Sequence, residues 1–358
     1  MEALRHTRNL VVGGAGFVGS NLVRRLLAVG VERVVVVDNL LSAERGNVPE
    51  DSCLEFVEGS IADDKVLSRL NDEFDYVFHL ATYHGNQSSI ANPLEDHANN
   101  LITTLKLYEH IKGFRKLKKV VYAASGCTLA PHTSDRSEAT TEEGSVPFDL
   151  DSTYQISKVV GEFYSVYYHR QHRLPTVRAR FQNVYGPGEI LGAGRWRGTP
   201  VTVWRNVTPT FIYRALKHLP LQIENNGEAT RDFIYVEDIV HGLLLCAVSG
   251  QPGDVYNLAS GVETSILELA TMINGVADNP APPEFLPRRT WDHSIKRFGS
   301  TEKSNRCLGF KAQIPLEEGI RRTMDWTRQN IHTLEACILK HAPHMNLHGP
   351  VPVLLKDV

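Results

Sequence analysis

The amino-acid sequence predicts an α/β protein with a doubly wound parallel sheet and a smaller C-terminal lobe. Three observations lead to this fold class. Short runs rich in β-branched residues alternate with helical patterns through the N-terminal half. These runs are almost continuously apolar, which is typical of parallel strands covered by helices on both faces. A glycine-rich turn joins the first run to the first helix, as in Rossmann-type folds.

The expected elements follow in a regular order along the chain. Strands are expected at residues 9–13, 33–37, 54–57, 76–80, 119–124, 176–181 and 254–258. Helices are expected at residues 19–29, 100–112, 154–169 and 210–217. We therefore assign residues 1–182 to a Rossmann domain, to which 233–258 return, and residues 183–232 and 259–330 to a substrate-binding lobe. Residues 331–358 are expected to form the end of a C-terminal helix and an extended tail.

The composition argues against several classes of protein. The chain has 358 residues and a net charge of -3, which gives no electrostatic reason to bind nucleic acid or anionic lipid. The five cysteines are scattered without metal-type spacing, which favours reduced thiols and no metal site. No apolar run approaches the roughly 18 residues of a membrane helix. The glycine loop begins almost at the N-terminus, so we expect a cytoplasmic protein without a signal peptide.

The glycine-rich turn has the spacing of a dinucleotide-binding loop. Gly13, Gly16 and Gly19 follow the first strand directly and open the first helix. The first two glycines allow the chain to turn close to a pyrophosphate, and the third allows the helix to pack on the sheet. Free N–H groups at the helix N-terminus would then bind the pyrophosphate. The alternative, a glycine-rich turn without a ligand, does not explain the position between strand and helix.

An acidic residue ends the second expected strand, about 20 residues after the glycine loop. A carboxylate at Asp38 would accept hydrogen bonds from the adenosine ribose hydroxyls and repel a 2′-phosphate. The position therefore favours NAD over NADP as the cofactor. A turn-forming aspartate before Asn39 is the structural alternative.

A tyrosine and a lysine four residues apart form a candidate catalytic pair. Tyr154 and Lys158 share one face of an expected helix. Because the phenol of a free tyrosine has a pKa near 10, it needs a neighbouring cation to act as a base at neutral pH. Ser125 follows the fifth strand, where its hydroxyl could bridge a substrate oxygen and the tyrosine. Packing on an amphipathic helix is the alternative for the pair, and the order of the three motifs favours catalysis.

Further motifs occur in the order typical of one family. They are Gly-Gly-Ala-Gly-Phe-Val-Gly at 13–19, Asp38-Asn39, His79-Leu80-Ala81, Asn99-Asn100, Tyr154 with Lys158, Asn183-Val-Tyr-Gly-Pro187 and Thr230-Arg231-Asp232-Phe233. On these motifs, residues 9–330 resemble an extended short-chain dehydrogenase/reductase of the NAD-dependent nucleotide-sugar epimerase/dehydratase family, similar to the UDP-glucose 4-epimerases.

The resemblance implies a role for each matching residue. The implied catalytic residues are Ser125, Tyr154 and Lys158. The implied NAD site consists of Gly13, Gly16, Phe17, Val18, Gly19, Asp38, Asn39, Ser60, Ile61, Leu80, Ala81, Thr82, Asn99, Tyr154, Lys158 and Phe181. The implied contacts to the nucleotide diphosphate and sugar are Asn183, Asn206, Arg231 and Arg289. We add His84, Ser125 and Arg195 as further candidate substrate contacts. A surface ion pair, such as Arg231 with Asp232, is the alternative for the arginines. The resemblance also implies a homodimer formed through the helices at 100–112 and 154–169.

The chain departs from the family pattern at three places. Ser60 stands where the family usually has an aspartate that contacts adenine, and His84 stands in a loop that often carries a small or basic residue. Gly126 and Cys127 follow Ser125, where the 4,6-dehydratases carry Asp-Glu, so a dehydratase is disfavoured. The Ser-x-Cys pattern is similar to the GDP-mannose 3,5-epimerase and GDP-fucose synthase branches, in which the cysteine is an acid/base. A buried structural cysteine is the alternative.

The favoured function is epimerisation at C4 of a UDP-hexose or derivative through a 4-keto intermediate. The alternatives are 3,5-epimerisation or other 4-keto-sugar chemistry that uses Cys127, and dehydration. A non-enzymatic NAD-sensing protein is a further class, but such proteins typically lack the tyrosine–lysine pair. The cluster Arg195-Trp196-Arg197 could bind an acidic or acylated sugar, or it could serve loop packing.

Overall fold

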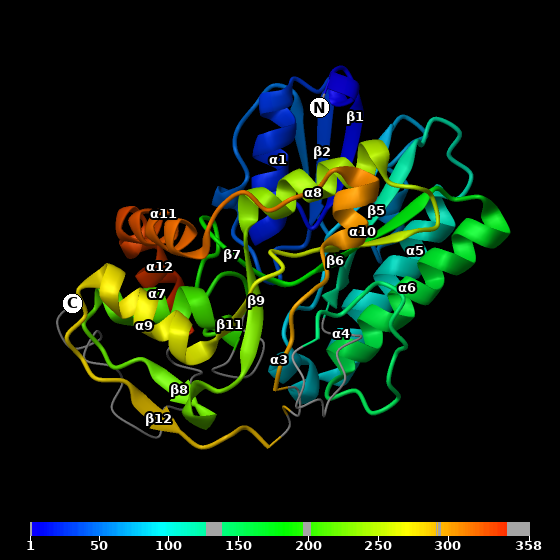
Figure 1. Cartoon of the computed structure of the whole chain (residues 1–358). Helices are drawn as coiled ribbons and strands as arrows, with labels where there is room; N and C mark the ends of the chain where they lie inside the picture. Colours follow the sequence, from blue (N-terminus) through cyan, green and yellow to red (C-terminus); the bar gives the residue numbers. More distant parts are fainter. Residues whose placement is uncertain (1, 127–137, 196–201, 291, 293–294, 342–358) are drawn as a thin grey trace.

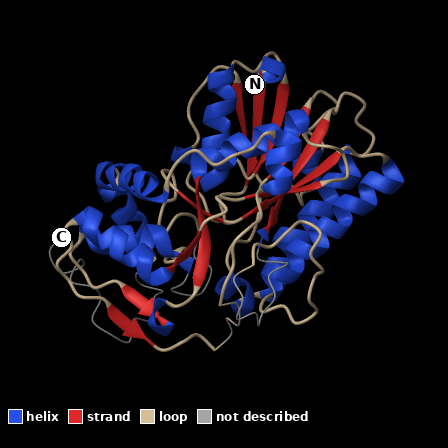
Figure 2. Cartoon of the chain, viewed as in Figure 1, coloured by secondary structure: helices blue, strands red, loops and turns tan. Residues whose placement is uncertain are grey.

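A seven-stranded parallel sheet forms the centre of the larger lobe (Figures 1 and 2). The computed structural model describes residues 2–126, 138–195, 202–290, 292 and 295–341. The strand order is β10-β6-β5-β4-β1-β2-β3. The chain adds β2 and β3 on one side of β1 and then β4 and the later strands on the other side, as in a Rossmann fold. The strands are β1 (Arg8–Val12), β2 (Arg33–Asp38), β3 (Leu54–Glu58), β4 (Tyr76–His79), β5 (Lys119–Ser125), β6 (Thr176–Phe181) and β10 (Val255–Leu258). The predicted fold class is confirmed.

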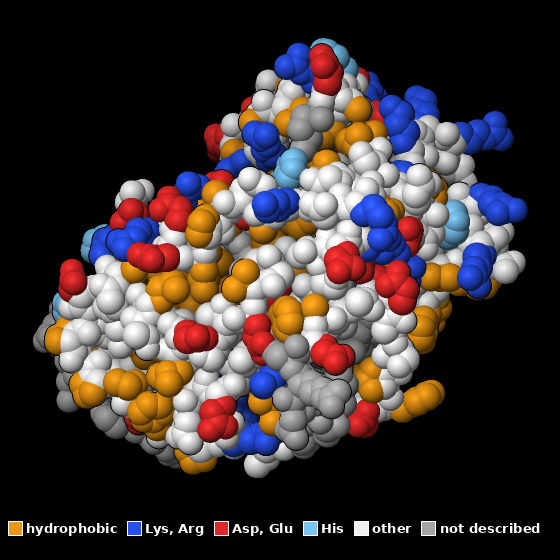
Figure 3. All heavy atoms as spheres, viewed as in Figure 1, with side chains coloured by type: hydrophobic (Ala, Val, Ile, Leu, Met, Phe, Trp, Pro, Cys, Tyr) orange, Lys and Arg blue, Asp and Glu red, His pale blue; other side chains and the backbone are white. Residues whose placement is uncertain are grey.

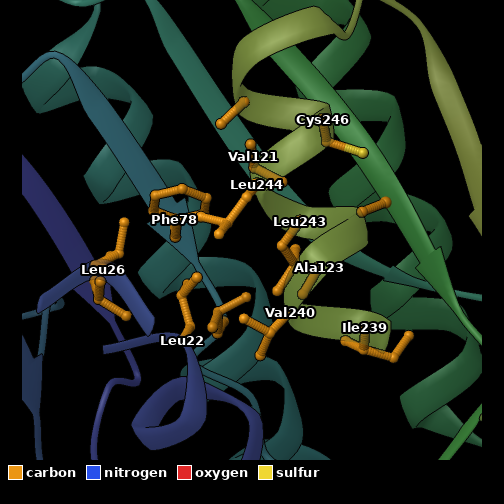
Figure 4. Packing of buried hydrophobic residues seen from close by; sticks show 14 of the residues in the cluster. Leu22, Leu26, Phe78, Val121, Ala123, Ile239, Val240, Leu243, Leu244 and Cys246 are labelled. Carbon is orange, nitrogen blue, oxygen red and sulfur yellow. The ribbon is translucent and has the colours of Figure 1, made fainter. Parts of the chain in front are cut away.

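Helices cover both faces of this sheet because successive strand residues point to opposite sides. In β1, Val11 packs into one core cluster, whereas Leu10 and Val12 pack into the other. Figure 4 shows the first cluster, in which apolar side chains of two helices meet the sheet. The helices on the sheet are α1 (Phe17–Val29), α2 (Asp64–Leu67), α5 (Thr103–Ile111), α6 (Thr153–His172), α8 (Val236–Ser249) and α10 (Glu302–Leu308).

The smaller lobe is built around its own apolar cluster and lies below the larger one in Figure 1. Its helices are α7 (Val207–Leu216), α9 (Ile266–Ala277), α11 (Leu316–Gln329) and α12 (Ile331–Leu339). One small sheet joins β7 (Asn183–Tyr185), β9 (Thr230–Tyr235) and β11 (Glu263–Ser265), and another pairs β8 (Gln222–Glu224) with β12 (Glu284–Leu286). The division of the chain into two domains at the expected boundaries stays a prediction.

The helix expected at residues 100–112 has a different beginning in the structure. The short helices α3 (Asn86–Ala91) and α4 (Pro93–His97) lead into a π-helical segment, Ala98–Ile102, before α5 begins at Thr103. A π-helical turn inserts an extra residue per turn and frequently marks a functional site. Here it lies beside the expected cofactor contacts, because Asn99 and Thr103 both line the cavity described below.

Two further predictions concern the surface and the C-terminus. Among the described residues, no helix is long and apolar enough to cross a membrane. On the face shown in Figure 3, acidic and basic side chains are interspersed. The predicted C-terminal helix continues as α11 and α12, whereas most of the expected extended tail, residues 342–358, lies outside the described residues.

Candidate active site

A cavity of about 680 Å³ lies at the carboxyl ends of the central strands. Its walls include residues that directly follow or end β1, β2, β4, β5 and β6, which is where Rossmann folds bind ligands. Nearly all the residues predicted for the site line it: Gly13, Gly16, Phe17, Val18, Gly19, Asp38, Asn39, Ser60, Ile61, Leu80, Ala81, Thr82, His84, Asn99, Ser125, Tyr154, Lys158, Phe181, Asn183, Asn206, Arg231 and Arg289.

Two glycines of the loop, Gly13 and Gly19, leave no room for a side chain. Gly13 has a φ of +85°, and a Cβ there would lie 2.5 Å from the backbone nitrogen of Ala81. A Cβ at Gly19 would lie 2.1 Å from the Gly13 carbonyl oxygen. Helix α1 begins at Phe17 with Gly16 as its N-cap, so its first N–H groups face the cavity end of the loop. This cradle fits the pyrophosphate of a dinucleotide.

Asp38 supports the loop as well as facing the cavity. One carboxylate oxygen accepts a hydrogen bond from the backbone N–H of Ala15, and the other accepts one from the N–H of Leu40, both at 2.9 Å. Burial raises the pKa of this carboxyl, and these backbone hydrogen bonds oppose the shift. A carboxylate offers about four acceptor positions, so the two backbone contacts leave capacity for ribose hydroxyls.

The tyrosine–lysine pair lies at the start of α6, which is firmly anchored. The Ser152 hydroxyl caps the helix by accepting from the Gln155 N–H, and the Tyr154 N–H donates to the Ser89 hydroxyl. Lys158 is 4% exposed, and its Nζ donates to the Ala123 carbonyl at 3.0 Å. The same Nζ lies 5.8 Å from the centre of the Tyr154 ring. A buried ammonium beside the phenol favours the phenolate.

The π-helical segment contributes a second asparagine that organises the wall of the cavity. The side-chain oxygen of Asn100 accepts from the Tyr83 N–H at 2.7 Å and from the Thr82 hydroxyl at 3.1 Å. Its amide nitrogen donates to the carboxylate of Asp96 at 2.8 Å. Asn100 is buried and does not line the cavity, so it holds the loop that carries Thr82 and His84 while Asn99 faces the cavity.

Arginines gather at the opposite end of the cavity from the glycine loop. Arg231 is 7% exposed and pairs with Asp292 at 3.1 Å, and Arg289 pairs with Glu224. The suggested pair between Arg231 and Asp232 is wrong. Asp232 is fully buried and accepts hydrogen bonds from the N–H and hydroxyl of Ser260 and from two further backbone groups. Neighbouring strand residues point to opposite faces, so the two side chains diverge.

His84 connects the catalytic pair to the smaller lobe. Its ring is edge-on to the Tyr154 ring, with the centroids 5.7 Å apart. Its Nε2 lies 3.1 Å from the side-chain oxygen of Asn206, which precedes α7. The two residues were predicted as separate substrate contacts, and in the structure they contact each other.

Two predicted residues are not placed in the cavity. Arg195 is exposed and is not among the lining residues, although its backbone N–H donates to the Leu41 carbonyl at 3.0 Å. Its neighbours Trp196 and Arg197 lie outside the described residues, as does Cys127. Within the described part of the chain, no group of three or more metal-ligating side chains is arranged to hold a metal ion.

Several cavity residues were missed by the sequence analysis. The charged ones are Glu189, Arg205, Arg214, Glu224, Arg288, Asp292 and Arg297. Arg288 adjoins the predicted Arg289, so a basic pair was a signal that could have been used. Glu189 follows the Asn183–Pro187 motif by two residues, but a single glutamate in a glycine-rich loop gives no spacing signal.

The loop that carries Glu189 also packs against the loop after β2, which lines the cavity. Gly194 has a φ of +85°, and a Cβ there would lie 2.4 Å from the Leu41 carbonyl oxygen. The Gly194 N–H donates to the Glu44 carboxylate at 3.0 Å, and Lys340 after α12 forms an ion pair with the same carboxylate. These contacts join three segments: the loop after β2, the loop between β7 and α7 that carries Glu189 and Gly194, and the end of α12.

Comparison with known proteins gives the family. Residues 9–259 match the model of the NAD dependent epimerase/dehydratase family. The chain is 33% identical to a UDP-glucose 4-epimerase of Mycolicibacterium smegmatis over 90% of this chain and 98% of that protein. It is 59% identical to the solved Bordetella bronchiseptica enzyme WbmF in complex with NAD+ and UDP, with a TM-score of 0.87 over 96% of this chain and 99% of that chain.

A more distant solved structure has the same fold. A UDP-N-acetylglucosamine 4-epimerase of Methanobrevibacter ruminantium, in complex with UDP-N-acetylmuramic acid, is 28% identical, with a TM-score of 0.79 over 91% of this chain and 99% of that chain. The family match confirms the predicted enzyme class and NAD as its cofactor, and the glycine cradle fits that cofactor. The chain belongs to the NAD dependent epimerase/dehydratase family.

Proposed function

We propose that this enzyme catalyses 4-epimerisation of a UDP-hexose or derivative. The observation that carries the proposal is that one cavity contains the glycine cradle, the tyrosine–lysine pair and the arginine end. Guanidinium groups pair well with diphosphate oxygens, so the arginines suit the nucleotide diphosphate. The UDP complex of WbmF and the two relatives named as UDP-sugar 4-epimerases support the choice of a UDP-sugar.

Tyr154 would act as the base toward the sugar O4 hydroxyl. The Lys158 ammonium, held in place by the Ala123 carbonyl, favours the phenolate that accepts this proton. Ser125, at the end of β5, would hold the sugar oxygen near the tyrosine. NAD, when bound, supplies the chemistry of accepting a hydride from C4 and returning it to the opposite face. Tyr154 would then return the proton to O4, so no proton is consumed overall.

The sugar must turn over between the two hydride transfers while the diphosphate stays bound. Arg231 and Arg289 would anchor the diphosphate in the smaller lobe. Dehydration fits the site less well. The Gln182 amide lies where a side chain at Gly126 would be, 2.2 Å from the Cβ position, so an acidic residue there would have to displace it.

The test is incubation of the NAD-loaded protein with UDP-glucose and UDP-N-acetylglucosamine in deuterated water, followed by NMR. The proposal expects the C4 epimer with no deuterium in carbon-bound positions, because the same hydride returns. Deuterium at C3 or C5 would instead support epimerisation that uses Cys127. Loss of water from the sugar would identify a dehydratase, and either result would overturn the proposal.

We also propose a homodimer formed through α5 and α6, as the family resemblance implies. Helix α6 exposes Ile156, Phe163 and Tyr167 by 46%, 60% and 51%, and spacings of seven and four place them on one face. Leu94 of the neighbouring α4 is 84% exposed. Light scattering of the wild type and of Phe163→Glu tests the dimer, which the variant should weaken.

We also propose a cytoplasmic location for this enzyme, which fits the reduced cysteines expected from the sequence.

A further inference from the structure

Glu189 is a buried carboxyl group in the wall of the cavity, and neither the catalytic pair nor the cofactor cradle accounts for it. It is 5% exposed and belongs to the loop between β7 and α7. One carboxylate oxygen, Oε1, accepts a hydrogen bond from the amide nitrogen of Asn206. The other oxygen, Oε2, has no hydrogen-bond partner among the residues that the structure describes.

An unpaired buried carboxylate oxygen is costly. Leaving a buried acceptor without a partner costs about 1–3 kcal/mol, and more when the group is charged. Burial raises the pKa of Glu189 to about 7, and the hydrogen bond from Asn206 and the nearby Arg205 guanidinium only partly oppose this shift. An alanine or leucine would satisfy packing at this position without that cost. A polar partner that arrives with the substrate accounts for the glutamate.

The carboxyl is connected to the catalytic tyrosine through two side chains. Because the Asn206 amide nitrogen donates to Glu189, its oxygen faces His84 and must accept from Nε2–H of that ring. The His84 ring in turn lies edge-on to Tyr154. The orientations of the amide and the ring are assigned from this hydrogen-bond network. Glu189, Asn206 and His84 therefore form a continuous polar wall that leads away from the reacting tyrosine.

We propose that this wall binds the hexose and that Glu189 is a specificity-determining residue, accepting a hydrogen bond from a hydroxyl or amide N–H on a sugar carbon other than C4. The inference rests on the proposed function, because it needs a sugar whose C4 lies at Tyr154. A site whose polar group is left unpaired discriminates strongly against a ligand that lacks the matching group. Sugars without a donor at this position should therefore be poor substrates.

The test compares binding of UDP with binding of UDP-glucose and UDP-N-acetylglucosamine to the NAD-loaded protein by calorimetry. The variant is Glu189→Gln, which keeps an oxygen for the Asn206 amide and places an NH2 group where the unpaired oxygen lies. The inference expects at least one UDP-sugar to bind about ten- to hundredfold more weakly to the variant, since hydrogen bonds to charged groups are worth about 1.5–3 kcal/mol. Affinity for UDP should change less than about twofold.

Glu142→Gln is the matched control. Glu142 is likewise buried, accepts the backbone N–H of Asn257 at 2.8 Å, and does not line the cavity. This control should leave the affinities for UDP and for both sugars unchanged. Equal weakening of UDP and UDP-sugar by Glu189→Gln, or no change in either, would overturn the inference. Failure of the wild type to bind any UDP-sugar while it binds UDP would instead overturn the proposed function on which it rests.

Discussion

The ammonium of Lys158 lies 5.8 Å from the centre of the Tyr154 ring while it donates to the Ala123 carbonyl on β5. This hydrogen bond holds the Lys158 ammonium against β5, so its charge has a fixed position beside the phenol. Because the two residues are four apart on α6, one helix carries both the proposed base and the ammonium that would activate it. The position of this helix relative to β5 therefore sets how close the ammonium lies to the Tyr154 ring.

The first prediction concerns Tyr154. Tyr154→Phe removes one oxygen and keeps the ring that packs against His84, so folding and NAD binding should be retained. Turnover should fall by about 10²–10⁴-fold, the usual contribution of a positioned acid or base. Steady-state kinetics with a UDP-sugar, together with NAD titration of the variant, measures both quantities. A loss below about tenfold would show that another group takes the O4 proton.

The second prediction concerns the choice of cofactor. Asp38 ends β2 at the cavity, where a 2′-phosphate would meet its carboxylate. Stripped wild-type protein should bind NAD more tightly than NADP. In Asp38→Asn the ratio of NADP to NAD affinity should rise about tenfold or more, because two negative charges no longer face each other. Fluorescence titration with both cofactors gives the ratio, and equal affinity in the wild type would contradict the assignment.

The third prediction is a pH dependence of sugar binding. The pKa of Glu189 is raised to about 7 by burial. Above that pH the charged carboxylate is a strong hydrogen-bond acceptor, and below it the group is protonated, loses its charge and is a weaker acceptor. Affinity for the UDP-sugar should therefore fall as the pH drops from 8 to 6. UDP is not the reference for this measurement, because its terminal phosphate itself titrates at about pH 6.

Other charged and titratable groups near Glu189 could also cause a pH dependence, so their contributions must be distinguished from that of Glu189. They are Arg205 on the same segment and His84 through Asn206. Both remain in Glu189→Gln, so a pH trend caused by either would persist in that variant. We therefore expect the affinity for the UDP-sugar to depend much less on pH in Glu189→Gln than in the wild type.

Much of this architecture can be predicted from the sequence because its signals are local. The strand-forming runs, the glycine loop and the spacing of Tyr154 and Lys158 each depend on residues close together in the chain. The wall of Glu189, Asn206 and His84 depends on tertiary contacts: His84 and Asn206 are 122 residues apart, and Glu189 and Asn206 are 17 apart across an irregular loop. The sequence carries no spacing signal for either contact. The π-helical segment before α5 was missed for a related reason. It coincides with the buried hydrogen bonds of Asn100, which are tertiary contacts and leave no local signal in the sequence.

The suggested pair between Arg231 and Asp232 could have been excluded from strand geometry. Residues 230–235 form strand β9, and adjacent strand residues face opposite sides, so the side chains of Arg231 and Asp232 cannot pair across the strand. The true partner, Asp292, lies 61 residues further along. Only the fold brings it to the arginine.

The fourth prediction concerns Cys127, which comes two residues after the end of β5 in the sequence and lies outside the described residues. Neither hydride transfer nor deprotonation of O4 needs a thiol. Cys127→Ser should therefore keep most of the 4-epimerase activity. Loss of activity with intact transient NADH absorbance would mean that proton transfer at C3 or C5 is the essential step, and would favour the alternative reaction.

The fifth prediction concerns retention of the cofactor. Glu44 holds the loop after β2 against the Gly194 N–H and Lys340, and that loop contributes Leu41, Ser42 and Ala43 to the cavity wall. Glu44→Ala leaves the Gly194 N–H without its acceptor and frees the loop. NAD should then dissociate roughly fivefold faster or more, as expected when an unmade hydrogen bond costs about 1–3 kcal/mol.

Lys340→Ala should have a smaller effect than Glu44→Ala. The ion pair is partly exposed, with side-chain exposures of 39% and 33%, and such pairs contribute about 0–1 kcal/mol. Glu335→Ala is the control, because Glu335 lies on α12 but pairs with Lys217 and Tyr213 and does not contact the cofactor loop. Stopped-flow release of NADH from the three variants and the wild type ranks them. Equal release rates in Glu335→Ala and Glu44→Ala would show that general loosening of α12, and not the Glu44–Gly194 contact, governs how long the cofactor stays bound.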